Sequence, residues 1–86
     1  MMKELEKQKE IVKEAMETVR IVNDMESRYQ LSIEILKLMK LEYIPDSIVF
    51  EIRKKYELHT TVWVLAELEL QKEGKDTLEQ NFDMSS

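Results

Sequence analysis

The stretch LSIEILKLMKLEYI, residues 31–44, decides the fold of this chain. Its apolar side chains cover more than half of a helix circumference, because the polar positions form only a narrow stripe: Gln30, Glu34, Lys37 and Lys40. A helix of this kind is normally covered on two sides. We therefore expect this segment to form the centre of the core. Pro45 ends it, since the residue before a proline disfavours the α region of backbone space.

The N-terminal segment, residues 2–25, also has a helical pattern. Leu5, Val12 and Val19 are seven residues apart, and Ala15 and Val22 form a second row with the same spacing. Two such rows are typical of a helix that packs along one seam. The next few residues allow either a helix boundary with a capping box, formed by Asn23 with Glu26 or by Ser27 with Gln30, or one helix that continues to about residue 43. We favour the continuous helix, because three-and-four spacing of apolar residues runs through the segment.

Two shorter helices are expected after Pro45. Asp46 or Ser47 can cap the first of them, and Ile52 lies on its apolar face. The second starts near Thr60 and runs to about Gly74. We expect Ile52 and the earlier Leu36 to be buried.

The predicted fold is all-α: a small bundle of three to four helices with a long N-terminal helix. Residues 1–74 form a single helical domain, and residues 75–86 form a polar, disordered C-terminal tail. A length of 86 residues allows one small domain. One glycine and one proline are too few for a fold built on many tight turns.

The composition excludes several classes of protein. The chain has no cysteine, so neither a disulfide framework nor a thiolate metal site is possible. No apolar run approaches the roughly 18–20 residues of a membrane span, and the N-terminal residues do not resemble a signal peptide. We expect a cytoplasmic protein that does not enter a membrane.

Catalytic, cofactor-binding and metal-binding residues are not expected. The one histidine, His59, sits at a helix junction and is interpreted as a cap or turn residue. The acidic residues Glu10, Glu14 and Glu17 alternate with basic ones, as in a solvated, charge-paired helix face. The chain is therefore not expected to be an enzyme.

The layout of residues 46–73 is similar to a helix-turn-helix, which makes a DNA-binding regulator the main alternative. Glu57 occupies the turn position where this motif usually has glycine. The second helix carries acidic residues in place of residues that contact base edges. Arg53, Lys54 and Lys55 could contact phosphates, but one basic triplet is a weak signal. A net charge of −5, from 13 basic and 18 acidic residues, also disfavours nucleic acid.

The function expected instead is binding to a protein. We interpret the chain as a small acidic regulator or inhibitor, of the type encoded by phages and plasmids, that docks a helix face on a host protein. Five residues are candidates for that contact: Phe50, Trp63, Glu67, Glu69 and Glu73. Phe50 together with Trp63 or Val64 could form an exposed apolar patch, which would mark a binding surface. These residues could instead seal the core or a dimer contact. A third interpretation is acidic mimicry of nucleic acid, in which Asp76 and Glu79 extend the row of carboxylates.

A homodimer is also expected. A first helix that reached residue 43 would be longer than the two short helices after Pro45 could cover. Part of its apolar stripe would then be buried against a second copy. The residues of this predicted dimer interface are Leu5, Val12, Ala15, Val19 and Val22.

Overall fold

Four helices make up the computed structural model, which describes the backbone of residues 2–85 and the side chains of residues 3–73. In chain order they are α1 (Met2–Ile21), α2 (Met25–Leu41), α3 (Asp46–Lys55) and α4 (Thr60–Ser85). The described backbone contains no strand, so the all-α prediction is confirmed. The last helix was expected to end at about Gly74, but α4 continues to Ser85. The predicted domain limit at residue 74 and the predicted tail at residues 75–86 lie outside the described side chains.

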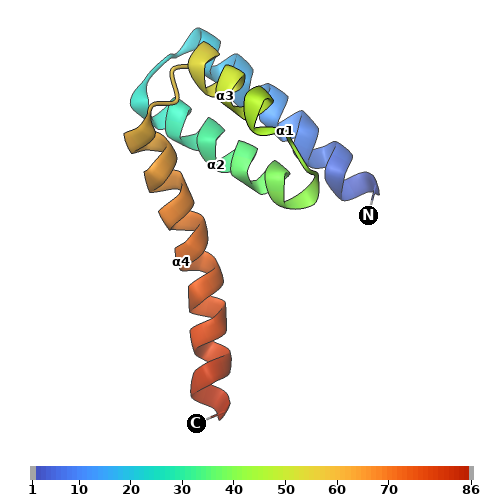
Figure 1. Ribbon diagram of the computed structural model, residues 1–86, viewed down its shortest axis with the longest axis vertical. Helices are drawn as coiled ribbons and strands as arrows, with labels where there is room; N and C mark the ends of the chain where they lie inside the picture. Colours follow the sequence, from blue (N-terminus) through green and yellow to red (C-terminus); the bar gives the residue numbers. More distant parts are fainter. Residues whose placement is uncertain (1, 86) are drawn as a thin grey trace.

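The first two helices form an antiparallel hairpin, so the predicted continuous helix is wrong (Figure 1). Residues 22–24 are not helical, and Asn23 has a φ of 50°. Asparagine tolerates this left-handed conformation better than most residues. Asp24 then caps α2 by accepting a hydrogen bond of 2.8 Å from the Ser27 backbone N–H, and the Ser27 hydroxyl contacts the Asp24 backbone in return. The boundary was among the alternatives, but this capping pair was not.

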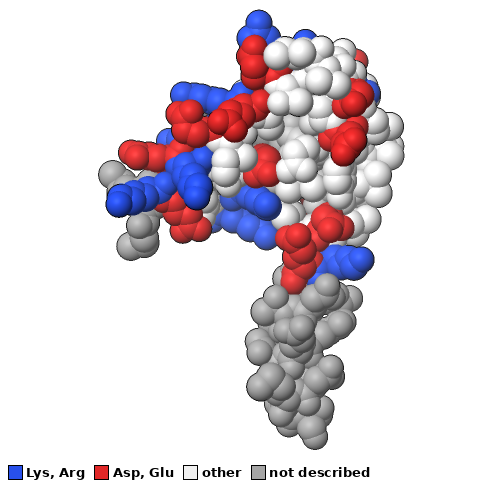
Figure 2. All heavy atoms as spheres, turned by 180° about the vertical axis from the view of Figure 1, so that it is seen from behind, with Lys and Arg blue, Asp and Glu red and all other residues white. Residues whose placement is uncertain are grey.

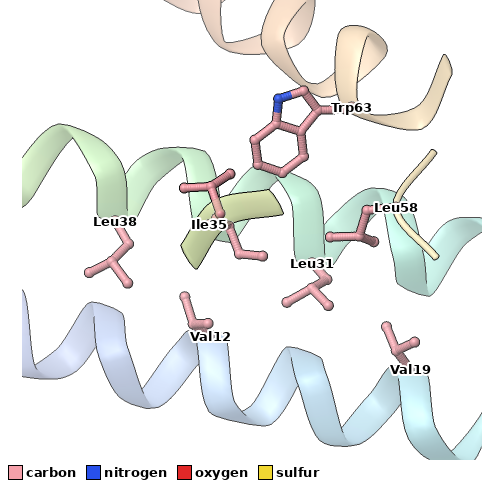
Figure 3. Close-up of a cluster of buried hydrophobic side chains, with 8 residues drawn as sticks. Val12, Val19, Leu31, Ile35, Leu38, Leu58 and Trp63 are labelled. Atoms are coloured by element: carbon pink, nitrogen blue, oxygen red, sulfur yellow. The ribbon is translucent and has the colours of Figure 1, made fainter. Parts of the chain in front are cut away.

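The prediction that α2 lies at the centre of the core is confirmed. Its Leu31, Ile35 and Leu38 point towards Val12 and Val19 of α1 (Figure 3). Another part of α2 packs on α4, through the cluster Ile33, Ala66 and Leu70 with the half-buried Tyr29 and Leu36 at its edge. α2 is therefore sandwiched between α1 and α4.

The short helix α3 completes the main cluster from a third side. Val49 of α3 is buried in it, together with Leu58 and Trp63 from the chain that follows. Ile52 is only partly buried against this cluster, as is Leu36 on α2, so both expected core residues lie at its edge. Pro45 occupies the N-cap position of α3 without a side-chain hydrogen bond, which corrects the expected cap at Asp46 or Ser47.

A carboxylate is buried between the first two helices. Glu34 is 8% exposed, although the sequence pattern placed it on the polar stripe of α2. The Gln8 Nε2 atom donates to the Glu34 Oε1 atom at 2.9 Å, and Gln30 Nε2 donates to Oε2 at 2.6 Å. These amides satisfy the carboxylate, as buried polar groups require.

Candidate interaction surface

The start of α4 is fixed on the bundle by one side of the helix. Val62, Trp63, Ala66 and Leu70 are buried. Their spacing of three and four residues places them on one stripe, and that stripe faces α2. The orientation of α4 is therefore set by its contact with α2.

Trp63 belongs to this buried stripe and not to a partner-binding surface. It is 7% exposed and packs in the main core cluster. The Arg53 guanidinium lies over its ring, 4.8 Å from the ring centroid, and Arg53 Nε donates to the Leu58 carbonyl at 3.2 Å. The expected exposed patch of Phe50 with Trp63 therefore does not form, and the alternative that the tryptophan seals the core holds.

The opposite side of α4 carries exposed aliphatic side chains. Val64, Leu65 and Leu68 are 42, 51 and 53% exposed, and we call these three residues the outer strip. At about 100° per residue, their mean direction points away from the buried stripe. Seen from behind the view of Figure 1, uncharged side chains cover a broad area above the point where α4 leaves the hairpin (Figure 2).

Two carboxylates flank the outer strip, one on each side. Glu67 follows Val64 by three residues, and Glu69 follows Leu65 by four, so each is a surface neighbour of a strip residue. Both glutamates are partly exposed. They were predicted as partner-binding residues, and they lie next to the apolar surface that such a partner would cover. Glu73 is exposed one turn further along.

This arrangement bears on the predicted nucleic-acid mimic. Glu67 and Glu69 lie on opposite flanks of the helix and do not form a single row of charges. Asp76 and Glu79 lie outside the described residues.

An apolar groove of about 260 Å³ runs between α2 and α4, next to the Glu67 flank. Its walls come from both helices, and its rim carries one acidic and one basic side chain. The lining residues are Leu36, Met39, Lys40, Glu67, Leu70 and Gln71.

The other predicted partner residue, Phe50, lines a different hollow from the groove beside Glu67. It lies on α3 and is 63% exposed. With Lys54 and His59 it lines a separate hollow of about 430 Å³ at the α3–α4 connection. The structure therefore does not unite Phe50 with the acidic candidates of α4.

The predicted basic triplet is only partly available to a phosphate backbone. Arg53 is held by Trp63 and Leu58, and the Lys55 ammonium lies over the Tyr56 ring at 5.6 Å from its centroid. Glu57 has a φ of 55°, the left-handed conformation that a turn glycine would adopt in a helix-turn-helix. The solvent-facing side of α4, however, presents the outer strip, and aliphatic side chains do not read the hydrogen-bonding edges of bases.

The predicted dimer interface is largely used within one chain. Val12 and Val19 are buried under α2, while Leu5 and Ala15 are partly buried against the same cluster. Val22, at the hairpin turn, is 54% exposed. The physical reason for a dimer through these five residues therefore no longer applies, because the hairpin covers its own stripe.

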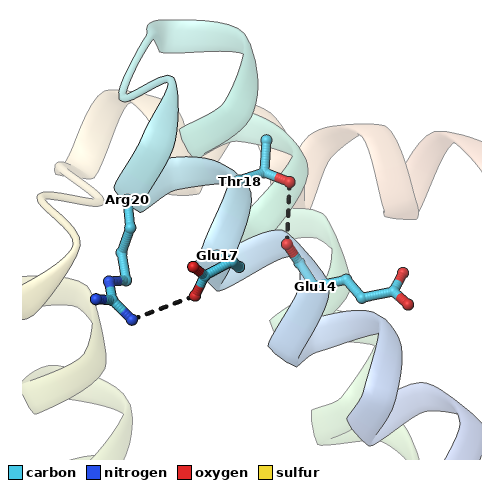
Figure 4. A network of polar contacts seen from close by, with 4 residues as sticks. All are labelled: Glu14, Glu17, Thr18 and Arg20. Atoms are coloured by element: carbon cyan, nitrogen blue, oxygen red, sulfur yellow. Dashed lines mark hydrogen bonds and ion pairs between the residues drawn. The ribbon is translucent and has the colours of Figure 1, made fainter.

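On the polar face of α1, two of the three predicted acidic residues form ion pairs. Glu17 accepts from the Arg20 guanidinium at 3.2 Å, and Lys13 lies 3.8 Å from Glu10 (Figure 4 shows the Arg20 end). His59 lies directly before α4, where its carbonyl accepts from the Trp63 N–H. Among residues 3–73, acidic residues and histidine form no cluster of three suited to a metal ion.

Comparisons with known proteins add no relatives. No protein-family model matches the chain, and no curated protein or solved structure matches it. The described helices include none that is long and apolar enough to cross a membrane.

Leu65 and Leu68 are the residues of the outer strip that the sequence analysis missed, whereas Val64 was a candidate for an exposed patch with Phe50. A signal for the outer strip is present, since α4 is apolar on two sides in the same way as α2. Leu65 and Leu68 were interpreted only as part of the last helix and not as a surface of it.

Proposed function

We propose that this protein is a small acidic interaction module, a cytoplasmic regulator or inhibitor of a host protein. In this proposal α4 inserts its outer strip into an apolar groove of the partner, and basic side chains on both rims of that groove pair with Glu67 and Glu69. The observation that carries the proposal is an aliphatic strip of half-exposed residues with one carboxylate on each flank.

Burial of the strip supplies the affinity in this scheme. A fully buried Val or Leu side chain contributes roughly 1.5–3 kcal/mol. The strip residues are about half exposed, so covering them adds roughly 1 kcal/mol each. The flanking carboxylates contribute mainly to selection of the partner, since rim charges steer association more than they stabilise the complex.

A second copy of the chain fits the strip less well than a basic partner does. Both flanks of the strip are acidic, so either direction of two-fold pairing sets carboxylate against carboxylate. The homodimer predicted from the sequence would therefore have to form through a surface other than the predicted interface on α1 or this strip. We infer that the free chain is monomeric.

DNA binding is the second candidate function, and the left-handed Glu57 at the turn is the observation that favours it. A titration with random duplex DNA at low salt separates it from the main proposal. Micromolar or tighter binding that is lost in Lys54→Glu/Lys55→Glu would replace the interaction module with a DNA-binding protein.

The main proposal is tested with a synthetic amphipathic helix that carries a leucine stripe with lysine on both flanks. We expect this peptide to bind the full chain and to shift the amide resonances of Val64, Leu65 and Leu68. Glu67→Lys/Glu69→Lys should weaken binding about tenfold, because two attractive rim contacts become repulsive.

The matched control is Glu10→Lys/Glu14→Lys, which makes the same change of charge on α1. It should leave the affinity unchanged. Equal binding of a peptide with glutamate flanks, or equal weakening by both double variants, would contradict a charge-selected site on α4.

A further inference from the structure

We propose that the groove between α2 and α4 receives one large apolar side chain of the same partner helix that covers the outer strip. The inference rests on the proposed function and specifies the partner: a basic amphipathic helix with an aromatic or leucine anchor.

The groove and the outer strip meet at Glu67. Val64, three residues before Glu67, belongs to the strip, whereas Leu70 and Gln71, three and four residues after it, line the groove. In a helix, residues three and four positions apart are surface neighbours, so Val64 lies next to Glu67 towards the helix N-terminus, and Leu70 and Gln71 lie next to it towards the C-terminus. One partner can therefore cover both the outer strip and the groove, because Glu67 is the charged residue at which they meet.

The size of the groove suits a side chain and not a whole ligand. Pockets for small molecules usually measure about 300–1,000 Å³, whereas a closed cavity of about 150 Å³ already accepts a benzene ring. An open groove of about 260 Å³ with Leu36, Met39 and Leu70 in its walls therefore has room for one aromatic or leucine side chain.

Charges on the rim set the order of residues in the partner. Glu67 stands on the α4 side and Lys40 on the α2 side, and no ion pair joins the two within residues 3–73. A partner cation is attracted to the Glu67 side and repelled from the Lys40 side. The partner helix should therefore carry a lysine or arginine three or four residues from its anchor, on the side that faces the outer strip.

The test uses two synthetic helices that share a leucine stripe with lysine flanks and differ at one position, phenylalanine or alanine, placed to reach the groove. We expect the phenylalanine peptide to bind the full chain about tenfold more tightly. The phenylalanine peptide should also shift the amide resonances of Leu36 and Met39, whereas the alanine peptide should leave these resonances unchanged.

The variant Gln71→Trp fills the groove from an exposed position and should reduce the affinity of the phenylalanine peptide to that of the alanine peptide. Glu14→Trp on α1, which lies across α2 from the groove, is the matched control and should leave the tenfold difference intact. The resonance shifts of the unmodified chain give the same answer if the tryptophan variant does not fold.

Each other outcome overturns the inference. Equal affinities of the two peptides, with shifts confined to Val64, Leu65 and Leu68, would remove the groove and leave the proposed function standing. Failure of both peptides to bind would remove the proposed function as well.

Discussion

At the scale of single residues, the buried carboxylate between α1 and α2 has the largest consequence. Glu34 is held by two amide donors, Gln8 on the facing helix and Gln30 one turn earlier on its own helix. Gln8 also donates to the Glu34 carbonyl at 2.9 Å, so one side chain bridges the two helices twice. A buried polar contact of this kind fixes the relative register of two helices, because a shifted pair would leave the carboxylate without donors.

Replacement of Gln8 tests this contact. Gln8 interrupts an apolar seam, so the sequence pattern alone predicts that Gln8→Leu stabilises the protein. The structure predicts the opposite: the loss of one donor to a buried carboxylate costs about 1–3 kcal/mol of unfolding free energy. Chemical denaturation of Gln8→Leu and of the double variant Gln8→Leu/Glu34→Leu measures both effects.

The double variant should recover most of the lost stability, because an apolar pair leaves no unsatisfied group. A single variant as stable as the parent would show that the contact does not contribute to the fold.

At the scale of helices, the connection between α1 and α2 separates what the sequence determines from what it leaves open. The apolar spacing continues through residues 22–25, and spacing alone does not distinguish one long helix from two helices in a hairpin. The left-handed Asn23 and the Asp24–Ser27 capping box decide for the hairpin. Both features form because packing of α2 against α1 is more favourable than a single continuous helix through residues 22–24.

The cap has a measurable pH dependence. Hydrogen bonds from Ser27, chiefly from its backbone N–H, hold the pKa of the Asp24 carboxyl below its ordinary value of 3.8. A carboxyl whose pKa is lower in the folded state stabilises that state above its unfolded pKa, and the effect is lost as the pH falls through the folded pKa. Asp24→Ala should therefore lower the melting temperature at neutral pH.

The difference from the parent protein should shrink as the pH drops below about 3.8. Asp46→Ala, at the start of α3 where Pro45 holds the N-cap position, is the control. A deficit of Asp24→Ala that stayed constant through the acid range would show that the charge of this carboxyl does not stabilise the hairpin.

The two apolar-rich helices show why surfaces are harder to predict than cores. For α2, the apolar residues around most of its circumference correctly predicted that the helix is buried on two sides. The prediction holds because both helices that pack on it belong to the same chain. For α4, one side is covered by α2, and the other carries the outer strip. Periodicity identifies apolar faces but does not say whether the neighbour belongs to the same chain or to another protein.

At the scale of the whole molecule, the hairpin changes which surfaces are open to a partner. A long first helix would have left Val12 and Val19 for a second copy, whereas the hairpin uses both for its own core. The exposed surface of residues 60–73 includes an apolar strip with a carboxylate on each flank. The partner suggested by the fold is therefore one of opposite charge and not a copy of the same chain.

The covered seam and the flanking carboxylates together determine the oligomeric state of the free protein. The free protein should sediment with a mass near 10.3 kDa, because its apolar seam is covered within the chain and the carboxylates beside its outer strip repel those of a second copy. Leu65→Glu/Leu68→Glu should not change that mass but should abolish binding of the lysine-flanked helix. A mass twice as large that fell to 10.3 kDa in this variant would mean that the strip pairs two copies in spite of its carboxylates. A doubled mass that persisted in the variant would place the dimer contact elsewhere, and the exposed residues of the hairpin turn, Ile21, Val22 and Met25, would be the next to substitute.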